Sequence, residues 1–181
     1  MITAFLSRDM THWFGRVHDR VAGGATYSHG GLHRRTAAVD ETFEHRLRAG
    51  SYPWLDYEVA WARGTMRLAE WRFRKMSTGR MDAVYYTIKK SWEGRLYGAS
   101  QVAGMLMRYA WMRVGVVRDV RQSSRGVCTE VLWCASRECY GEYAEHLEAF
   151  CRAENCGRDS FGPREAEALY TSAPELYVRV R

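Results

Sequence analysis

Short apolar runs, several of them alternating with polar residues, predict strands in the first part of the chain. Alternation places every second side chain on the same face of a strand, which is typical of a sheet with one buried face. The runs that predict strands are Thr3–Ser7, Ala25–His33, Thr36–Phe43 and Thr65–Phe73. The signal is weakest at Thr36–Phe43, and the alternation slips once within Thr65–Phe73. A final apolar segment covers Leu176–Val180.

Apolar residues spaced three and four apart predict helices, and glycines follow most of these segments as stop signals. Ser77 or Thr78 is suited to cap the second helix, because hydroxyl side chains accept hydrogen bonds from the first free N–H groups. The segment Trp54–Trp61 is compatible with a helical turn or with a loop. The predicted helices are His12–Val21, Ser77–Trp92, Val127–Tyr140 and Pro163–Tyr170.

Strand and helix signals alternate without a linker, an internal repeat or a low-complexity tract. The chain has 181 residues, of which 46% are hydrophobic and only three are proline, which is the composition of a folded domain. We therefore predict one α+β domain over residues 1–181, a small sheet with helices packed on it.

The most apolar window, Tyr97–Val117, raises the question of a membrane span. Arg108 and Arg113 interrupt it, whereas a spanning helix needs about 20 predominantly apolar residues. We expect buried helices there and no membrane span. The first residues contain acids and arginines but no apolar core of a signal peptide, so we expect a protein made in the cytoplasm.

The formal net charge of +6 could indicate a nucleic-acid partner. However, only three of the 27 basic residues are lysine, and the basic residues are spread along the chain among acidic ones. A GC-rich coding sequence produces such an arginine bias, so we do not expect nucleic acid as a partner.

The five cysteines all lie in the last third of the chain, at positions 128, 134, 139, 151 and 156. Structural zinc sites pair their ligands at short spacings, and no such tight pair is present here. We expect free thiols rather than a zinc site or a disulfide framework, and no cofactor.

Phosphate-binding loops, the dinucleotide-binding fingerprint, the zinc-protease helix and the serine-hydrolase elbow are all absent from the sequence. Two short stretches remain as candidates for chemistry. His29 lies on a predicted strand beside Gly30 and Gly31, which cannot cover its imidazole. Cys128 lies at the first turn of a predicted helix, where free N–H groups and the helix dipole stabilise a thiolate. Taken singly, each also fits an ordinary structural residue.

Together these stretches resemble the circularly permuted papain-like thiol hydrolases, relatives of NlpC-type peptidases that include the YiiX-like proteins. In that family a Ser-His strand precedes a helix that starts with Cys-[Ser/Thr]-Glu. Here the two motifs are Ser28-His29-Gly30-Gly31-Leu32 and Cys128-Thr129-Glu130. The opening strand, the Gly94–Gly98 turn and the Ser172–Tyr177 segment resemble phage and prophage members. The resemblance implies a permuted papain-like fold.

The resemblance also implies roles for particular residues. Cys128 would be the nucleophile and His29 the base that later protonates the leaving group. A polar residue on the next strand would orient the imidazole. Glu41 or Asp40 could do so, and we favour Glu41; neighbouring strand residues face opposite sides, so only one of them can point at His29.

The leading hypothesis is therefore a cysteine hydrolase that cleaves an amide or an ester through a thioester. The expected substrate is a peptide, a peptidoglycan stem peptide or an acyl group. The alternative is a catalytically silent structural or interaction protein of a phage particle, with other phage structural proteins as partners. A basic nucleic-acid binder is a third, less favoured reading.

Overall fold

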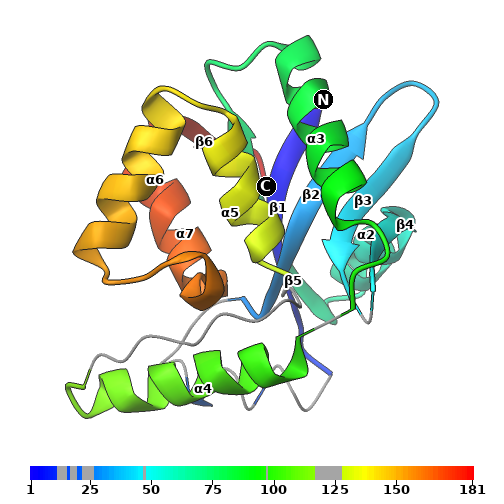
Figure 1. The fold of residues 1–181 in the computed structure, drawn as a ribbon. Coiled ribbons are helices and arrows are strands. Elements are labelled where there is room, and N and C mark those ends of the chain that lie inside the picture. Colours follow the sequence, from blue (N-terminus) through cyan, green and yellow to red (C-terminus); the bar gives the residue numbers. More distant parts are fainter. Residues whose placement is uncertain (12–15, 17–19, 22–26, 47, 97, 117–127) are drawn as a thin grey trace.

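The computed structural model describes residues 1–11, 16, 20–21, 27–46, 48–96, 98–116 and 128–181. Within these ranges the chain has an α+β architecture, a six-stranded antiparallel sheet with helices packed on it (Figure 1). The predicted class is therefore confirmed.

The sheet has the strand order β4-β3-β2-β1-β5-β6, and each neighbouring pair is antiparallel. Its strands are β1 (Ile2–Asp9), β2 (His29–Arg35), β3 (Asp40–His45), β4 (Ala49–Pro53), β5 (Met66–Phe73) and β6 (Tyr177–Arg179). The register pairs Ser7 with His29 and Gly31 with Glu44. Because side chains alternate along a strand, this register decides which residues of β1, β2 and β3 share a face.

The helices are α2 (Leu55–Ala62), α3 (Thr78–Trp92), α4 (Ala99–Arg113), α5 (Glu130–Glu138), α6 (Glu142–Ala153) and α7 (Pro163–Ser172), with a 3-10 turn, η1 (Arg158–Ser160). The Ser77 side chain accepts a hydrogen bond from the Arg80 N–H and so caps α3. Gly94 follows that helix with φ +79°, a left-handed conformation that glycine adopts without strain.

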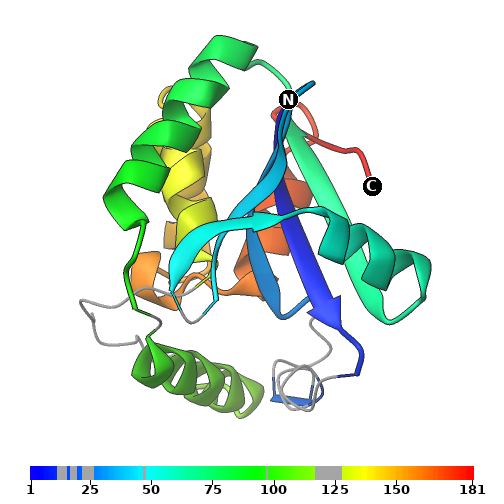
Figure 2. The ribbon, with the colours of Figure 1, turned by 90° about the vertical axis from the view of Figure 1, so that its right-hand side faces the viewer.

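The two faces of the sheet differ in chemistry. One face carries apolar side chains such as Leu6, Leu32 and Trp71, which form the main core with residues of α3, α5 and α7. The opposite face carries a small apolar cluster around Phe5 and Trp54, together with most of the polar strand residues. Seen along the sheet, α3 and α5 lie on one side and α2 lies on the other (Figure 2).

Several elements differ from the sequence-based prediction. Trp54–Trp61, left open between helix and loop, is mostly the helix α2, and α4 occupies most of the apolar window. Strand β4 and helix α6 were not predicted. The expected helix over His12–Val21 and the polar segment after Val117 fall largely outside the described residues. Among the described residues, no helix is long and apolar enough to cross a membrane.

Candidate functional site

His29 and Cys128 are neighbours at one end of the sheet. His29 is the first residue of β2, and Cys128 lies two residues before α5, whose first turn is beside the start of β2 (Figure 1). Gly30 permits this close packing of helix on strand. A Cβ atom there would lie 2.9 Å from Leu132 Cδ1 of α5 and 2.7 Å from Leu6 Cδ2 of β1. The glycine after the histidine therefore brings the helix start to the imidazole.

The His29 ring is held between a thiol and a carboxylate. Nε2 contacts Glu44 Oε2, and the ring also forms a hydrogen bond with the Cys128 side chain. Because Glu44 engages Nε2, Nδ1 is the nitrogen left for the sulfur. Burial disfavours the charged imidazolium, but Cys128 and Glu44 outweigh it and raise the pKa of His29 to about 10. This environment favours a proton on the ring and a thiolate on Cys128.

Glu44 is fully buried, yet both of its oxygens have partners. Tyr57 Oη donates to Oε2 at 2.5 Å, and Thr42 Oγ1 donates to Oε1 at 2.8 Å. Arg46 Nη2 lies 3.0 Å from Oε1. Burial would raise the pKa of Glu44, but His29 and then Arg46 and Tyr57 lower it to about 2. Glu44 is therefore an ionised acceptor that fixes the orientation of His29.

Gly31 makes room for this carboxylate. A Cβ atom at Gly31 would lie 2.8 Å from Glu44 Cβ, 2.7 Å from the Phe43 carbonyl oxygen and 2.9 Å from Phe5 Cε1. The space that it leaves open is occupied by the Phe5 ring, which lies 6.4 Å from the His29 ring. The second glycine of the motif therefore serves the site as well.

Glu41, the acid favoured from the sequence, is not beside His29. It accepts a hydrogen bond from Tyr85 Oη at 3.0 Å and lies 3.8 Å from Lys89 Nζ, on the face covered by α3. The alternation argument was sound, but the acid chosen was wrong. Residues 40, 42 and 44 share the face of His29, and Glu44 is the one next to it through its pairing with Gly31.

Asp40, the alternative acid, lies on the same face as His29 but binds a different histidine. His33 is 1% exposed, with Nε2 at 2.7 Å from Asp40 Oδ1 and Nδ1 at 2.9 Å from Glu70 Oε2. Its ring stacks on Trp54 with centroids 3.8 Å apart. Both ring nitrogens of His33 are therefore engaged by carboxylate oxygens.

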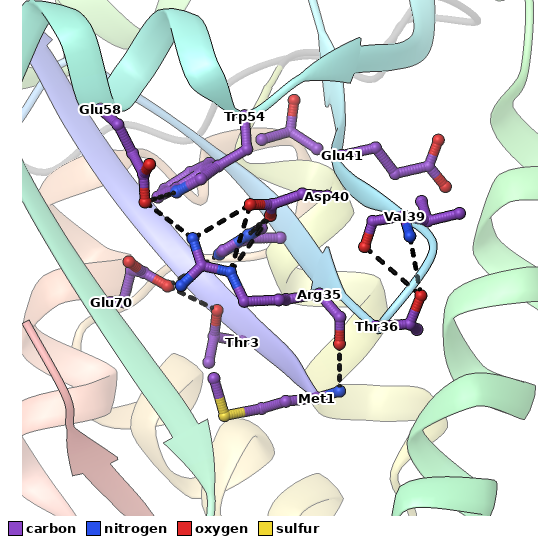
Figure 3. A network of polar contacts seen from close by, with 12 residues as sticks. Met1, Thr3, Arg35, Thr36, Val39, Asp40, Glu41, Trp54, Glu58 and Glu70 are labelled. Atoms are coloured by element: carbon purple, nitrogen blue, oxygen red, sulfur yellow. Dashed lines mark hydrogen bonds and ion pairs between the residues drawn. The ribbon is translucent and has the colours of Figure 1, made fainter.

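Charged groups surround this second histidine (Figure 3). Arg35 binds Asp40 and also donates to Glu58 Oε1 at 2.7 Å, which in turn accepts from Trp54 Nε1 at 3.1 Å. Glu41 extends away from this network. The network holds Trp54 against the sheet, and Trp54 stacks on Tyr57, the donor to Glu44. We interpret it as structural support for the site.

The first turn of α5 is anchored from the other side. Thr129 is buried, and its hydroxyl donates to the Phe161 carbonyl oxygen at 2.6 Å. Arg158 lies 3.6 Å from the buried carboxylate of Glu130. These contacts fix the helix start directly after Cys128, where backbone N–H groups and the helix dipole favour negative charge.

The remaining cysteines have different surroundings. Burial raises the pKa of Cys134 to about 11 and that of Cys139 to about 12, so both are held as thiols. In the part of the chain that the structure describes, no three His, Cys, Asp or Glu side chains form a group that could hold a metal ion.

The comparisons with known proteins identify the fold. No family model matches the sequence, and no curated protein matches it in sequence. Among solved structures, the chain is similar to the metalloprotein YiiX of Escherichia coli O157:H7, with a TM-score of 0.54 at 13% identity. The match covers 78% of this chain and 66% of that one, just under two thirds of its length. The chain therefore has a YiiX-like fold.

The word metalloprotein describes that neighbour. Among the described residues of this chain, the two strand histidines have other partners: His29 contacts a thiol and one carboxylate, and both ring nitrogens of His33 contact carboxylates. The arrangement at His29 instead suits proton transfer between sulfur and nitrogen.

Proposed function

We propose that this protein is a cysteine hydrolase that cleaves an amide or an ester through a thioester intermediate. The observation that carries the proposal is the His29 ring held between the Cys128 side chain and the buried carboxylate of Glu44. A nucleophile, its base and a group that orients the base are the three parts such chemistry needs. The YiiX-like fold is compatible with a permuted papain-like arrangement, in which the histidine precedes the cysteine.

The reaction would begin from the ion pair of the Cys128 thiolate and the protonated His29 ring. The thiolate attacks the carbonyl carbon of the substrate, and the carbonyl electron pair moves to the oxygen. N–H groups at the start of α5 are suited to stabilise that oxyanion. The oxyanion then collapses, the carbon–nitrogen or carbon–oxygen bond breaks, and the proton on His29 passes to the leaving group.

The thioester is then hydrolysed by the same residues. His29 takes a proton from water, and the resulting hydroxide attacks the thioester carbonyl carbon. Collapse of the second tetrahedral intermediate releases a carboxylic acid and restores the Cys128 thiolate beside the protonated His29. Glu44 keeps its negative charge throughout, because its role is to hold Nε2–H and to stabilise the imidazolium.

The substrate is proposed from the sequence resemblance alone. The candidate substrates are peptidoglycan stem peptides, other peptides and acyl groups. A location in a phage particle is proposed on the same resemblance. The intact Cys128, His29 and Glu44 arrangement favours an enzyme over a catalytically silent structural protein.

Selective alkylation tests the proposal without knowledge of the substrate. Cys128 and Cys139 are similarly buried, at 2% and 1% exposed, and peptide mass spectrometry reports each cysteine separately. We expect Cys128 to react at pH 6 to 7 at least about ten times faster than Cys139, because a thiolate is the nucleophile. His29→Ala should remove that advantage. Equal rates at Cys128 and Cys139 in the native protein would contradict the proposal.

A further inference from the structure

The C-terminal end of α6 is closed by two backbone hydrogen bonds. The Cys156 N–H donates to the Cys151 carbonyl oxygen at 2.9 Å, and the Asn155 N–H donates to the Arg152 carbonyl oxygen at 3.4 Å. Asn155 has φ +46°, the left-handed conformation that ends such helices. These features together are a Schellman cap, with its 6→1 and 5→2 bonds.

A Schellman cap brings together the side chains of its first and last residues, usually as an apolar contact. Here both residues are cysteines, and their side chains lie close enough for each to shift the pKa of the other. The 6→1 hydrogen bond also holds the main chains of the two cysteines close together. A disulfide requires such closeness, because its two Cα atoms are about 4.4–6.8 Å apart. Both thiols are partly exposed, so a small reagent has access to them.

We propose that Cys151 and Cys156 are a redox site, a dithiol that converts reversibly to an intramolecular disulfide by exchange with a low-molecular-weight disulfide such as oxidised glutathione. This site is separate from Cys128, and the inference stands independently of the proposed hydrolase activity.

The exchange is balanced in two steps. The Cys151 thiolate attacks one sulfur of oxidised glutathione, which forms a mixed disulfide and releases one glutathione thiolate. Cys156 then loses its proton and attacks the Cys151 sulfur, which releases the second glutathione thiolate and forms the protein disulfide. The two protein thiols are oxidised, and one glutathione disulfide is reduced to two thiols.

The environments of the two thiols suit this order of attack. The interaction between the two thiols lowers the pKa of Cys151 and raises that of Cys156. Cys151 is therefore the attacking sulfur, and Cys156 is the resolving one.

The turn that contains Cys156 is bound to two other parts of the molecule. Arg108 of α4 donates to the carbonyl oxygens of Glu154 at 3.3 Å and Asn155 at 3.4 Å. The same stretch of chain continues through η1 to Phe161, whose carbonyl oxygen accepts the Thr129 hydroxyl beside Cys128. A disulfide would fasten this stretch to the end of α6.

Trypsin provides a direct test, because it cleaves after Arg152, between the two cysteines. The full-length protein is incubated with oxidised glutathione, its remaining thiols are alkylated, and it is digested without reductant. We expect peptides 138–152 and 153–158 to stay covalently linked, and to separate when dithiothreitol is added before alkylation. Glutathione bound at Cys128 would be found on a different tryptic peptide, so it does not affect the detection of the linked peptides.

Cysteine-to-serine variants identify which two cysteines form the disulfide. Peptide 138–152 also contains Cys139, so Cys139→Ser should keep the linked peptides, whereas Cys151→Ser should lose them. Cys156→Ser should trap a glutathione adduct on Cys151. The proposal is overturned if the wild-type protein yields only glutathione adducts or free thiols at these positions, or if the linked peptides persist in Cys151→Ser.

Discussion

Tyr57 and His29 both contact the same carboxylate oxygen, Oε2 of Glu44, one from helix α2 and the other from the start of β2. Tyr57 belongs to α2, which lies on one side of the sheet, whereas α3 and α5 pack on the other side. The orientation of His29 therefore depends on helix α2 as well as on strands β2 and β3.

Glu44→Gln should lower the reactivity of Cys128, although glutamine has nearly the same volume as glutamate. In Glu44→Gln the imidazolium loses its buried counter-charge, and the amide can impose the wrong tautomer on His29. We expect kcat/KM, once a substrate is found, to fall by about 10²–10⁴-fold. The rate of Cys128 alkylation near pH 6 should fall as well. Glu41→Gln is the matched control, and an equal effect of both changes would refute the role of Glu44.

Removing the Tyr57 hydroxyl should have a smaller effect in the same direction. Tyr57→Phe keeps the ring stacked on Trp54 but removes the phenol hydrogen bond to Glu44 Oε2, while the contact of that oxygen with His29 remains. We expect a loss of activity of about 10-fold. Because the phenol hydrogen bond helps to lower the pKa of Glu44, the acid limb of the pH–rate profile should move to higher pH. An unchanged profile would show that Tyr57 serves packing only.

The Glu44–His29 pair should give stability that is lost at both pH extremes. The folded pKa of Glu44, about 2, is below its usual 4.5, so its contribution is present above pH 4.5 and is lost as the pH falls through 2. The folded pKa of His29, about 10, is above its usual 6.5, so its contribution is complete below pH 6.5 and is lost as the pH rises through 10. Thermal unfolding from pH 2 to 10 checks this.

The difference between wild-type and Glu44→Gln melting temperatures isolates the pair from other acids. It should be largest between about pH 4.5 and 6.5 and shrink on either side. A difference that does not vary with pH would show that Glu44 stabilises the fold by packing rather than by charge.

Gly31→Ala should destabilise the fold, whereas Gly50→Ala should not. The new methyl group at Gly31 would lie 2.7 Å from a backbone oxygen that cannot move aside, whereas at Gly50 the nearest atom is 3.8 Å away. We expect Gly31→Ala to cost about 1–3 kcal/mol of unfolding free energy. Urea unfolding of both variants measures this, and equal stabilities would contradict the packing argument.

The two strand histidines should respond differently to replacement. His33→Ala removes one of the partners of the buried Glu70, which keeps Thr3 and Arg181, and it removes the ring stacked on Trp54; we expect a loss of about 2 kcal/mol or more. His29→Ala should abolish selective Cys128 alkylation while the protein stays folded. Circular dichroism and urea unfolding separate the two effects. A fully stable His33→Ala would contradict the structural role of this cluster.

Much of the fold could be predicted because apolar periodicity reports local structure directly. The alternation over Thr65–Phe73 and the cap at Ser77 both correspond to elements of the structure. Strand β4 and helix α6 were missed. Helix α6 does carry a signal, since Tyr143, Leu147 and Phe150 recur at helical spacing, but β4 is short and contains little apolar side chain beyond Tyr52.

The site was partly predictable for a related reason. A cysteine at a helix start and a histidine beside glycines are visible in the sequence, and the structure places these two residues together. The third residue depended on the register between β2 and β3, and periodicity alone does not determine a register. Glu41 and Glu44 lie three positions apart on one strand, so they necessarily face opposite sides of the sheet.

The sequence by itself determined the class of the fold, the elements with strong periodicity, and the two residue types able to carry out thiol chemistry, because these follow from neighbours along the chain. Only the tertiary structure decided that Glu44 lies beside His29, that His33 is a buried support, and that Cys151 meets Cys156. The physical reason is that strand register and helix-cap geometry join residues through space, and charges act across those contacts rather than along the sequence.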